Sequence, residues 1–182
     1  MKRVETIHSD NDIARMIRAL RNIHHRYGLL FWLGVDTGLR ISDLIQIRAG
    51  IVLACKEAGY DMRIMQRKTQ QPVTVTLSKK MLELIEGYVQ NEGLEASDFV
   101  FYSSSYKKGT PVSRQHVWRV FRKIAASEGI FGVGTHTMRR TFAARHYREH
   151  HNLIKLQERL GHKYITSTLN YLMQPDGTMI SG

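Results

Sequence analysis

The apolar residues of this chain recur at helical spacing along most of its length, and only one pair of stretches alternates in the way of β-strands. Residues 61–67 alternate weakly between apolar and polar, residues 73–77 alternate cleanly, and residues 68–72 between them are typical of a short turn. This pattern predicts two antiparallel strands in an otherwise helical chain. We therefore expect an α+β fold that is mostly α-helical and has one small antiparallel β-sheet.

The helical segments are placed by their apolar periodicity and by residues that favour helix starts. Ser9, Ser78 and Ser113 each precede such a segment, where a serine hydroxyl can cap the first turn. Residues 49–60 suit either a helix or a strand and turn, and residues 99–102 are a short apolar segment of either type. Helices are expected at about residues 10–25 and 27–35, from Ile41, from Ser78, from Ser113, and at about 137–150, 152–160 and 166–173.

Composition narrows the class of protein. The 182 residues suit one domain, and a hydrophobic content of 42% excludes a disordered chain. Lys and Arg number 27 against 16 acidic residues, a net charge of +11 that indicates a binder of DNA or RNA. Cys55 is the only cysteine, which suits a reducing compartment, and the longest apolar run, residues 29–33, is too short to span a membrane. We expect a cytoplasmic, nucleoid-associated protein with no membrane partner.

Four short motifs contain the residue types that metal-free cleavage of a phosphodiester needs. Thr37-Gly38-Leu39-Arg40 and His136-Thr137-Met138-Arg139 each supply an arginine, Leu160-Gly161-His162 supplies a second histidine, and Tyr171 follows nine residues after it. Arginine holds phosphate oxygens with a planar pair of donors that stays charged. A tyrosine hydroxyl can attack phosphorus, and histidine can move protons near neutral pH. The set therefore predicts strand cleavage through a covalent protein–DNA link.

The ordered set resembles the tyrosine recombinase (phage integrase) family, from about residue 8 to residue 173. The resemblance implies that Arg40 and Arg139 are the two phosphate-clamping arginines. It implies that Asp43 supports the site as the family's acidic residue. It also implies that Lys68 protonates the leaving 5′ oxygen, although Arg63, Arg67 and Lys79 are nearby alternatives.

The same resemblance assigns the remaining site residues. His136 pairs with Arg139 as a proton-transfer group, His162 donates a hydrogen bond to the phosphate, and Tyr171 is the nucleophile that forms a 3′-phosphotyrosine. No cofactor, metal or ATP is implied, because the covalent link stores the bond energy and the cations do the electrostatic work.

The resemblance also implies an organisation and partners. We expect residues 1–174 to be a tyrosine recombinase catalytic domain and residues 175–182 to be a C-terminal tail. Many members have a separate N-terminal helical domain, so the chain is either a fragment or a short form like the fimbrial phase-variation recombinases. The implied partner is a double-stranded DNA recombination site, bound by a homotetramer on two duplexes, with accessory DNA-bending proteins in some members.

Other interpretations compete with this one. The chain can be a catalytically silent DNA-binding module on the same scaffold. Taken singly, each residue also has a structural interpretation: Tyr171 as an ordinary helix tyrosine, Asp43 as a solvated helix residue, His136 as a helix cap, His162 as a loop histidine, and Arg40 and Arg139 as surface arginines. A basic set along one helix predicts contacts to DNA phosphates, with a solvated charged face as the alternative: Arg114, Arg119, Arg122 and Lys123.

A zinc-protease pattern is a further alternative. His146-Tyr147-Arg148-Glu149-His150 places two histidines four residues apart on an expected helix, with Glu149 between them. A third ligand is needed, and only Glu158, His162 and Asp176 follow. We therefore expect His146, His150 and His151 to lie on a solvated or DNA-facing helix edge.

Overall fold

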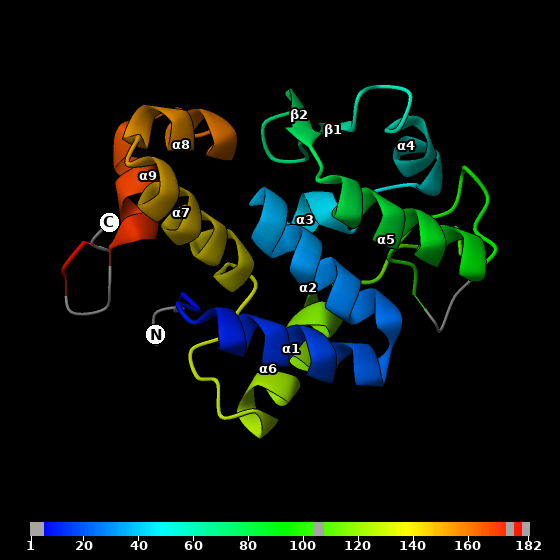
Figure 1. Ribbon diagram of the computed structural model, residues 1–182, viewed down its shortest axis with the longest axis horizontal. Helices are drawn as coiled ribbons and strands as arrows, with labels where there is room; N and C mark the ends of the chain where they lie inside the picture. The colour runs from blue at the N-terminus through cyan, green and yellow to red at the C-terminus, as the bar shows by residue number, and fades with distance from the viewer. Residues whose placement is uncertain (1–5, 104–107, 174–176, 180–182) are drawn as a thin grey trace.

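The computed structural model describes residues 6–103, 108–173 and 177–179. The fold is mostly helical with one two-stranded antiparallel sheet, which confirms the expected α+β class (Figure 1). No helix in this part of the chain is long and apolar enough to cross a membrane. The helices are α1 (Asp10–Ile23), α2 (His25–Thr37), α3 (Ile41–Leu44), α4 (Ala49–Ala54), α5 (Lys79–Asn91), α6 (Arg114–Ser127), α7 (Thr137–His150), α8 (Leu153–Leu160) and α9 (Ile165–Leu172), and the strands are β1 (Asp61–Met65) and β2 (Pro72–Thr76).

Three helices begin at the serines that the sequence indicated. The hydroxyls of Ser9, Ser78 and Ser113 each accept a hydrogen bond from the backbone N–H three residues later, at the starts of α1, α5 and α6. These bonds satisfy donors that have no partner inside the helix. The helix starts are therefore confirmed.

The sheet is a hairpin in which Asp61 lies opposite Thr76 and Met65 lies opposite Pro72. The expected first strand is too long, because the ladder stops at Met65 and the chain turns from residue 66 onward. The ambiguous residues 49–60 form α4 followed by turns. The segment 99–102 forms only isolated bridges, one from Phe99 to Arg48 and one from Tyr102 to Pro111.

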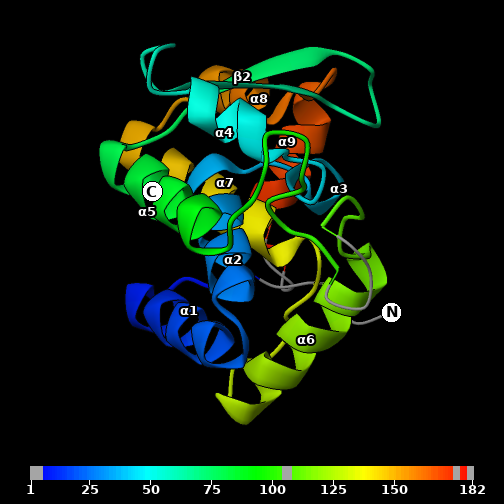
Figure 2. The ribbon, with the colours of Figure 1, turned by 90° about the vertical axis from the view of Figure 1, so that its right-hand side faces the viewer.

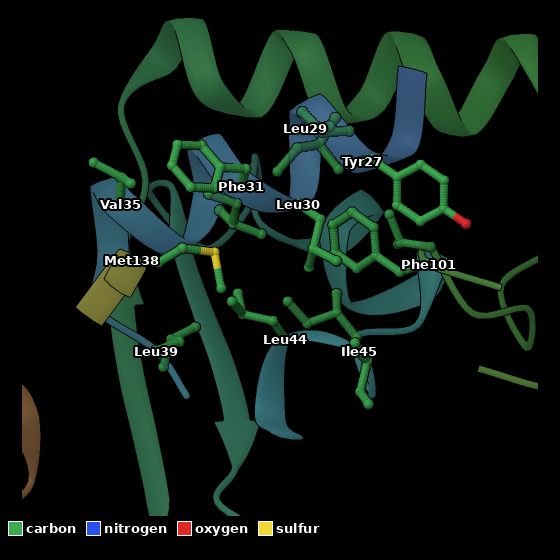
Figure 3. Packing of buried hydrophobic residues seen from close by; sticks show 14 of the residues in the cluster. Tyr27, Leu29, Leu30, Phe31, Val35, Leu39, Leu44, Ile45, Phe101 and Met138 are labelled. Atoms are coloured by element: carbon green, nitrogen blue, oxygen red, sulfur yellow. The ribbon is translucent and has the colours of Figure 1, made fainter. Parts of the chain in front are cut away.

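A large apolar cluster, here called the main core, surrounds α2. Leu30 and Phe31 of α2 are fully buried there, and the ring of Phe31 meets Phe121 of α6 edge to face at 5.4 Å. Figure 3 shows Met138 of α7 entering the same cluster from the opposite side to Phe101. In Figure 2, α1, α5 and α7 lie around α2, and the β-hairpin lies at the other end of the molecule from α6.

A second, much smaller cluster, here called the C-terminal cluster, joins α7, α8 and α9. Its fully buried residues within the described chain are Ala143, Ala144, Leu156, Leu160 and Leu172. Figure 1 shows α8 and α9 beside α7, on the side of α7 away from α2. Helix α7 therefore connects two unequal bodies, with Met138 in one and Ala143 in the other.

Candidate active site

The six residues predicted to do the chemistry meet at one cleft of about 660 Å³. They come from five separate segments: the link between α2 and α3, the turn of the β-hairpin, the start of α7, the loop after α8, and α9. The cleft is lined by Arg40, Ile41, Ser42, Arg67, Lys68, Arg114, Thr135, His136, Arg139, His162, Ser167, Asn170 and Tyr171.

Arg139 is the most deeply placed cation of the site. It is 2% exposed, so a surface role for it is wrong. Its Nη1 donates to the carbonyl of Gly38 at 2.8 Å, and its Nη2 donates to the carbonyl of Leu160 and to His162 Nε2, the latter at 3.0 Å. Burial, and then the charge of Arg40, lower the pKa of Arg139 to about 10. The guanidinium therefore stays charged at neutral pH and is fixed by the backbones on both sides of the cleft.

The conformation and surroundings of Gly38 explain why a glycine lies two residues before Arg40. It ends α2 in the left-handed region with φ of 68°, which glycine adopts without steric cost. A Cβ there would lie 2.3 Å from Cδ1 of Phe142 on α7. The glycine thus lets the end of α2 approach α7 closely enough for its carbonyl to accept from Arg139. Two residues later, Arg40 enters the same cleft.

Arg40 is held by a residue that the sequence analysis missed. Its Nη1 donates to Oε1 of Gln66 at 3.2 Å, and Thr69 Oγ1 donates to the same oxygen at 2.8 Å. Gln66 is buried, and its amide lies against Gly161, where a Cβ would be 3.3 Å from Nε2. Gln66 continues the alternation by which Met62 and Ile64 of β1 are buried, and this position in the pattern could have identified it as a buried residue.

Asp43 and Lys68 are linked through the hairpin turn. Asp43 is 2% exposed, so the solvated alternative is wrong, and its Oδ1 accepts from the backbone N–H of Arg67 at 3.0 Å. This bond fixes the residue before Lys68, whose exposed side chain lines the cleft. Of the alternatives to Lys68, Arg67 also lines the cleft, whereas Arg63 and Lys79 do not.

Hydrogen bonds at both ring nitrogens orient His162. An arginine can only donate, so the contact with Arg139 makes His162 Nε2 an acceptor, and Nδ1–H then donates to Thr168 Oγ1 at 3.0 Å. Burial, then the charges of Arg139, Arg40 and Lys68, lower the pKa of His162 to about 4. The imidazole is therefore neutral at neutral pH. To donate to a phosphate, as its family role implies, it would have to bind a proton at Nε2.

Tyr171 faces the second histidine. Its hydroxyl lies 3.4 Å from His136 Nδ1, and its ring centroid lies 5.1 Å from that of His162 and 5.5 Å from Cζ of Arg139. His136 occupies the N-cap position of α7 but makes no side-chain capping bond, so its imidazole is available to the cleft. Burial, then nearby arginines led by Arg139, lower the pKa of His136. A neutral imidazole beside a phenol hydroxyl can accept its proton.

The predicted DNA contacts on α6 separate into two groups. Arg114, the first residue of the helix, lines the cleft. Arg119, Arg122 and Lys123 are exposed outside it, and Arg122 lies over the ring of Trp118 at 5.0 Å. A role for these three in binding DNA stays a prediction.

The zinc-protease alternative lacks its third ligand in the described part of the chain. His146 and His150 lie with ring centroids 4.5 Å apart and line a different cleft, between α7, α8 and β2. No group of three or more His, Cys, Asp or Glu among the described residues is placed to hold a metal ion. His150 is exposed and His146 is half-buried, and the cleft that both line is also bordered by β2.

The family model described as "Phage integrase family" matches residues 8–176. The chain is 27% identical over 169 residues to the probable integrase/recombinase YoeC of Bacillus subtilis (strain 168), covering 93% of this chain and 89% of that protein. It is 27% identical over 172 residues to the tyrosine recombinase XerH of Campylobacter jejuni subsp. jejuni, covering 90% of this chain and 47% of that protein. The chain thus spans most of one relative and about half of the other.

Solved structures give the same fold. The XerA recombinase superposes with a TM-score of 0.77 at 19% identity, covering 95% of this chain and 60% of that chain. The XerH site-specific recombinase, in a pre-cleavage complex with its difH substrate, superposes with a TM-score of 0.72 at 22% identity, covering 93% and 51%. Since the family model matches most of its residues, the chain belongs to the phage integrase family.

Proposed function

We propose, from its membership of the phage integrase family, that this protein is a site-specific DNA recombinase that cuts and rejoins strands through Tyr171. One observation carries the proposal. Two arginines, two histidines, a lysine and a tyrosine from five segments line one cleft, with the tyrosine hydroxyl 3.4 Å from His136 Nδ1. A structural role for each residue singly does not account for their convergence on one cleft.

The proposed cleavage step is a transfer of phosphorus between two oxygens. The Tyr171 hydroxyl gives its proton to neutral His136 and attacks the phosphorus, so a bond to the phenolic oxygen forms. The bond to the 5′ oxygen breaks, and that oxygen takes a proton from Lys68 and leaves as a free hydroxyl. The product is a 3′-phosphotyrosine. Rejoining runs the same step in reverse with a 5′ hydroxyl from another strand, and it needs no ATP.

The arginines stabilise the charge that develops in that step. Arg40 and Arg139 donate to the two nonbridging oxygens, and because Gln66 and Gly38 already hold the two side chains, little reorganisation is needed at the moment of reaction. Fixed donors of this kind contribute several kcal/mol each to a transition state, on the order of 3 kcal/mol. No step requires a metal.

The proposed partner is a double-stranded DNA recombination site. The similar solved structure of an XerH site-specific recombinase is bound to a difH substrate, and the present chain has a net charge of +11. By analogy with the family, a homotetramer on two duplexes would exchange strands in pairs, with accessory DNA-bending proteins where the site requires them. Contacts to phosphates predict binding that weakens steeply with salt.

A covalent trap tests the proposal. Wild-type protein and a Tyr171→Phe variant are mixed with a pooled library of nicked duplexes, quenched in detergent, and examined for DNA that migrates with protein. A nick lets the freed end diffuse away, so the covalent product accumulates. We expect an adduct with wild type alone, and sequencing of the trapped DNA then identifies the site. Equal salt-sensitive binding by both proteins, with no adduct from either, would instead favour a silent DNA-binding module.

A further inference from the structure

Two consecutive arginines of α7 have different surroundings. Arg139 lines the cleft, whereas Arg140 does not. Arg140 is nevertheless buried, at 8% exposed, and its guanidinium reaches α9. Its Nη1 donates to the backbone carbonyl of Asn170 at 3.0 Å, and its Nη2 donates to the carbonyl of Met173 at 2.5 Å.

Those two carbonyls flank the nucleophile. Asn170 directly precedes Tyr171, and Met173 is the C-cap of α9. The last carbonyls of a helix lack partners within it and carry the negative end of its dipole, so a cation that bridges two of them stabilises the last turn. Figure 1 shows α9 beside α7, the helix that supplies the arginine.

Helix α9 is also held by its buried side chains and by the hydrogen bond between Thr168 and His162. It has eight residues and no side-chain bond at its N-cap, and a helix of that length is marginal by itself in water. Its buried side chains are Thr168 and Leu172. The anchor from Arg140 therefore lies at the end of α9 that holds the tyrosine.

We propose that Arg140 is a positioning residue for Tyr171: it fixes the last turn of α9 so that the hydroxyl stays in line with the phosphate held by Arg40 and Arg139. This inference rests on the proposed function only in naming Tyr171 as nucleophile. A nucleophile displaced by about 1 Å loses on the order of a hundredfold in rate without losing substrate binding. Arg140 thus acts on the rate of cleavage through geometry and not by contact with DNA.

Amide hydrogen exchange of Arg140→Gln tests the anchor directly. We expect faster exchange in residues 169–173 and unchanged exchange in α8, because the last turn of α9 loses the guanidinium that bridges its carbonyls. Arg148→Gln is the matched control, since Arg148 is a half-buried arginine of the same helix whose guanidinium contacts His8 instead of the carbonyls of α9. Unchanged exchange in residues 169–173 would overturn the proposal. This measurement needs no catalysis, so it remains decisive if wild type forms no adduct and the proposed function fails.

A small external nucleophile separates positioning from phosphate binding. In the Tyr171→Phe background, peroxide anion can attack the phosphorus in place of the phenol and expel the 5′ oxygen, which leaves as a hydroxyl. Arg140→Gln is expected to slow tyrosine-dependent cleavage of saturating DNA about a hundredfold. Added to Tyr171→Phe, it is expected to leave peroxide-dependent cleavage within about twofold, because peroxide does not depend on α9.

Arg140→Lys completes the series, since a lysine keeps the charge and one donor but not the paired geometry. We expect it to recover about tenfold of the lost rate, with a DNA Kd equal to wild type. An equal loss of the tyrosine-dependent and peroxide-dependent reactions would place Arg140 in the phosphate cleft or in global folding. That result would overturn the positioning role.

Discussion

The two sides of the cleft are built on apolar clusters of very different size. Arg40 and Lys68 stand on segments that pack on the main core, which extends from α1 to the start of α7. Tyr171 and His162 belong to the part of the chain built on the small C-terminal cluster. That part contacts α7 through the apolar C-terminal cluster and also through polar contacts of two α7 arginines: Arg139 to the carbonyl of Leu160, and Arg140 to α9. Arg40 and Lys68 are thus placed by a large apolar core, whereas Tyr171 and His162 are placed by a small cluster supplemented by hydrogen bonds.

The difference has a consequence for how each side fails. Loss of packing in the main core lowers the free energy of unfolding of the whole domain, because that cluster includes most of its elements. Loss of a contact in α8 or α9 can open a local unit while the rest stays folded. The side of the cleft that carries Tyr171 is therefore the part in which geometry can change with little change in global stability.

A pair of leucine truncations gives the largest expected effect. Leu30 and Leu172 are both fully buried, one in the main core and one in the C-terminal cluster. We expect Leu30→Ala to lower the free energy of unfolding by about 4 kcal/mol and Leu172→Ala by about 2 kcal/mol, because a small cluster relaxes around a cavity more readily. Urea unfolding measures both values.

The two leucine variants should rank in the opposite order for the loss of cleavage rate per folded molecule. Leu172 follows Tyr171 directly, so Leu172→Ala is expected to reduce that rate more than Leu30→Ala does. If both variants lose the same free energy of unfolding and cleave at the same rate, the two sides of the cleft do not differ in local stability.

Gly38→Ala is the next largest change. An alanine would keep the unfavourable φ of 68° and place its Cβ 2.3 Å from the Phe142 ring. We expect a loss of about 3 kcal/mol in the free energy of unfolding, from backbone strain of about 1 kcal/mol and overpacking of about 2 kcal/mol.

Gly59→Ala separates the two causes. Gly59 has the same φ of 68°, and nothing lies within 4 Å of the Cβ it would gain, so it should lose only the strain of about 1 kcal/mol. Thermal unfolding of both variants measures the difference. If the two losses are the same, the close approach of α2 to α7 does not constrain residue 38.

Gln66→Met tests the clamp side with a smaller effect. Methionine fills a similar volume but leaves Arg40 without its side-chain acceptor. Since a hydrogen bond to a charged group contributes about 1.5 kcal/mol, we expect cleavage to fall about tenfold at saturating DNA. Gln71→Met is the control, because Gln71 is an exposed glutamine of the same turn. Single-turnover rates should separate the two variants, and equal rates would show that Gln66 does not position Arg40.

The helical fold and the six catalytic candidates that line the cleft could be predicted from the sequence because both are marked by local patterns and short motifs. Periodicity marks helices, and serines mark their starts, as at Ser78. Arg40 and Tyr171 were identified before their proximity was known because the ordered set of motifs resembles the tyrosine recombinase family. The end of β1 was misplaced because alternation continues past the last ladder pair, at Met65.

The supporting contacts could not be predicted in the same way. Arg140 bonds to backbone carbonyls, which have no signature in the sequence of the segment that provides them. Thr168 became a partner of His162 only through the packing of α9 against α8. The division into a catalytic domain and a tail at residue 174 stays a prediction, because residues 174–176 and 180–182 lie outside the described chain.

The smallest expected effect is a change in the pH profile of cleavage. Burial, then the charges of Arg139, Arg114, Arg40 and Arg140, lower the pKa of His136 below its ordinary value of 6.5. His136 must be neutral to accept the Tyr171 proton, so the rate should fall as pH drops through that pKa. Removing one positive charge in Arg114→Gln raises the pKa, and the acid limb should move to higher pH.

Arg119→Gln is the control that tests whether the shift is specific to a charge in the cleft. Arg119 is an exposed residue of the same helix that does not line the cleft, so this variant loses equal charge but should keep the acid limb of wild type. Single-turnover cleavage at saturating DNA, measured between about pH 5 and 8, gives the midpoints without a contribution from binding. A shift in both variants would assign the effect to net charge. A shift in neither would mean that the acid limb does not report His136, and the proton acceptor of Tyr171 would have to be sought among the other groups that line the cleft.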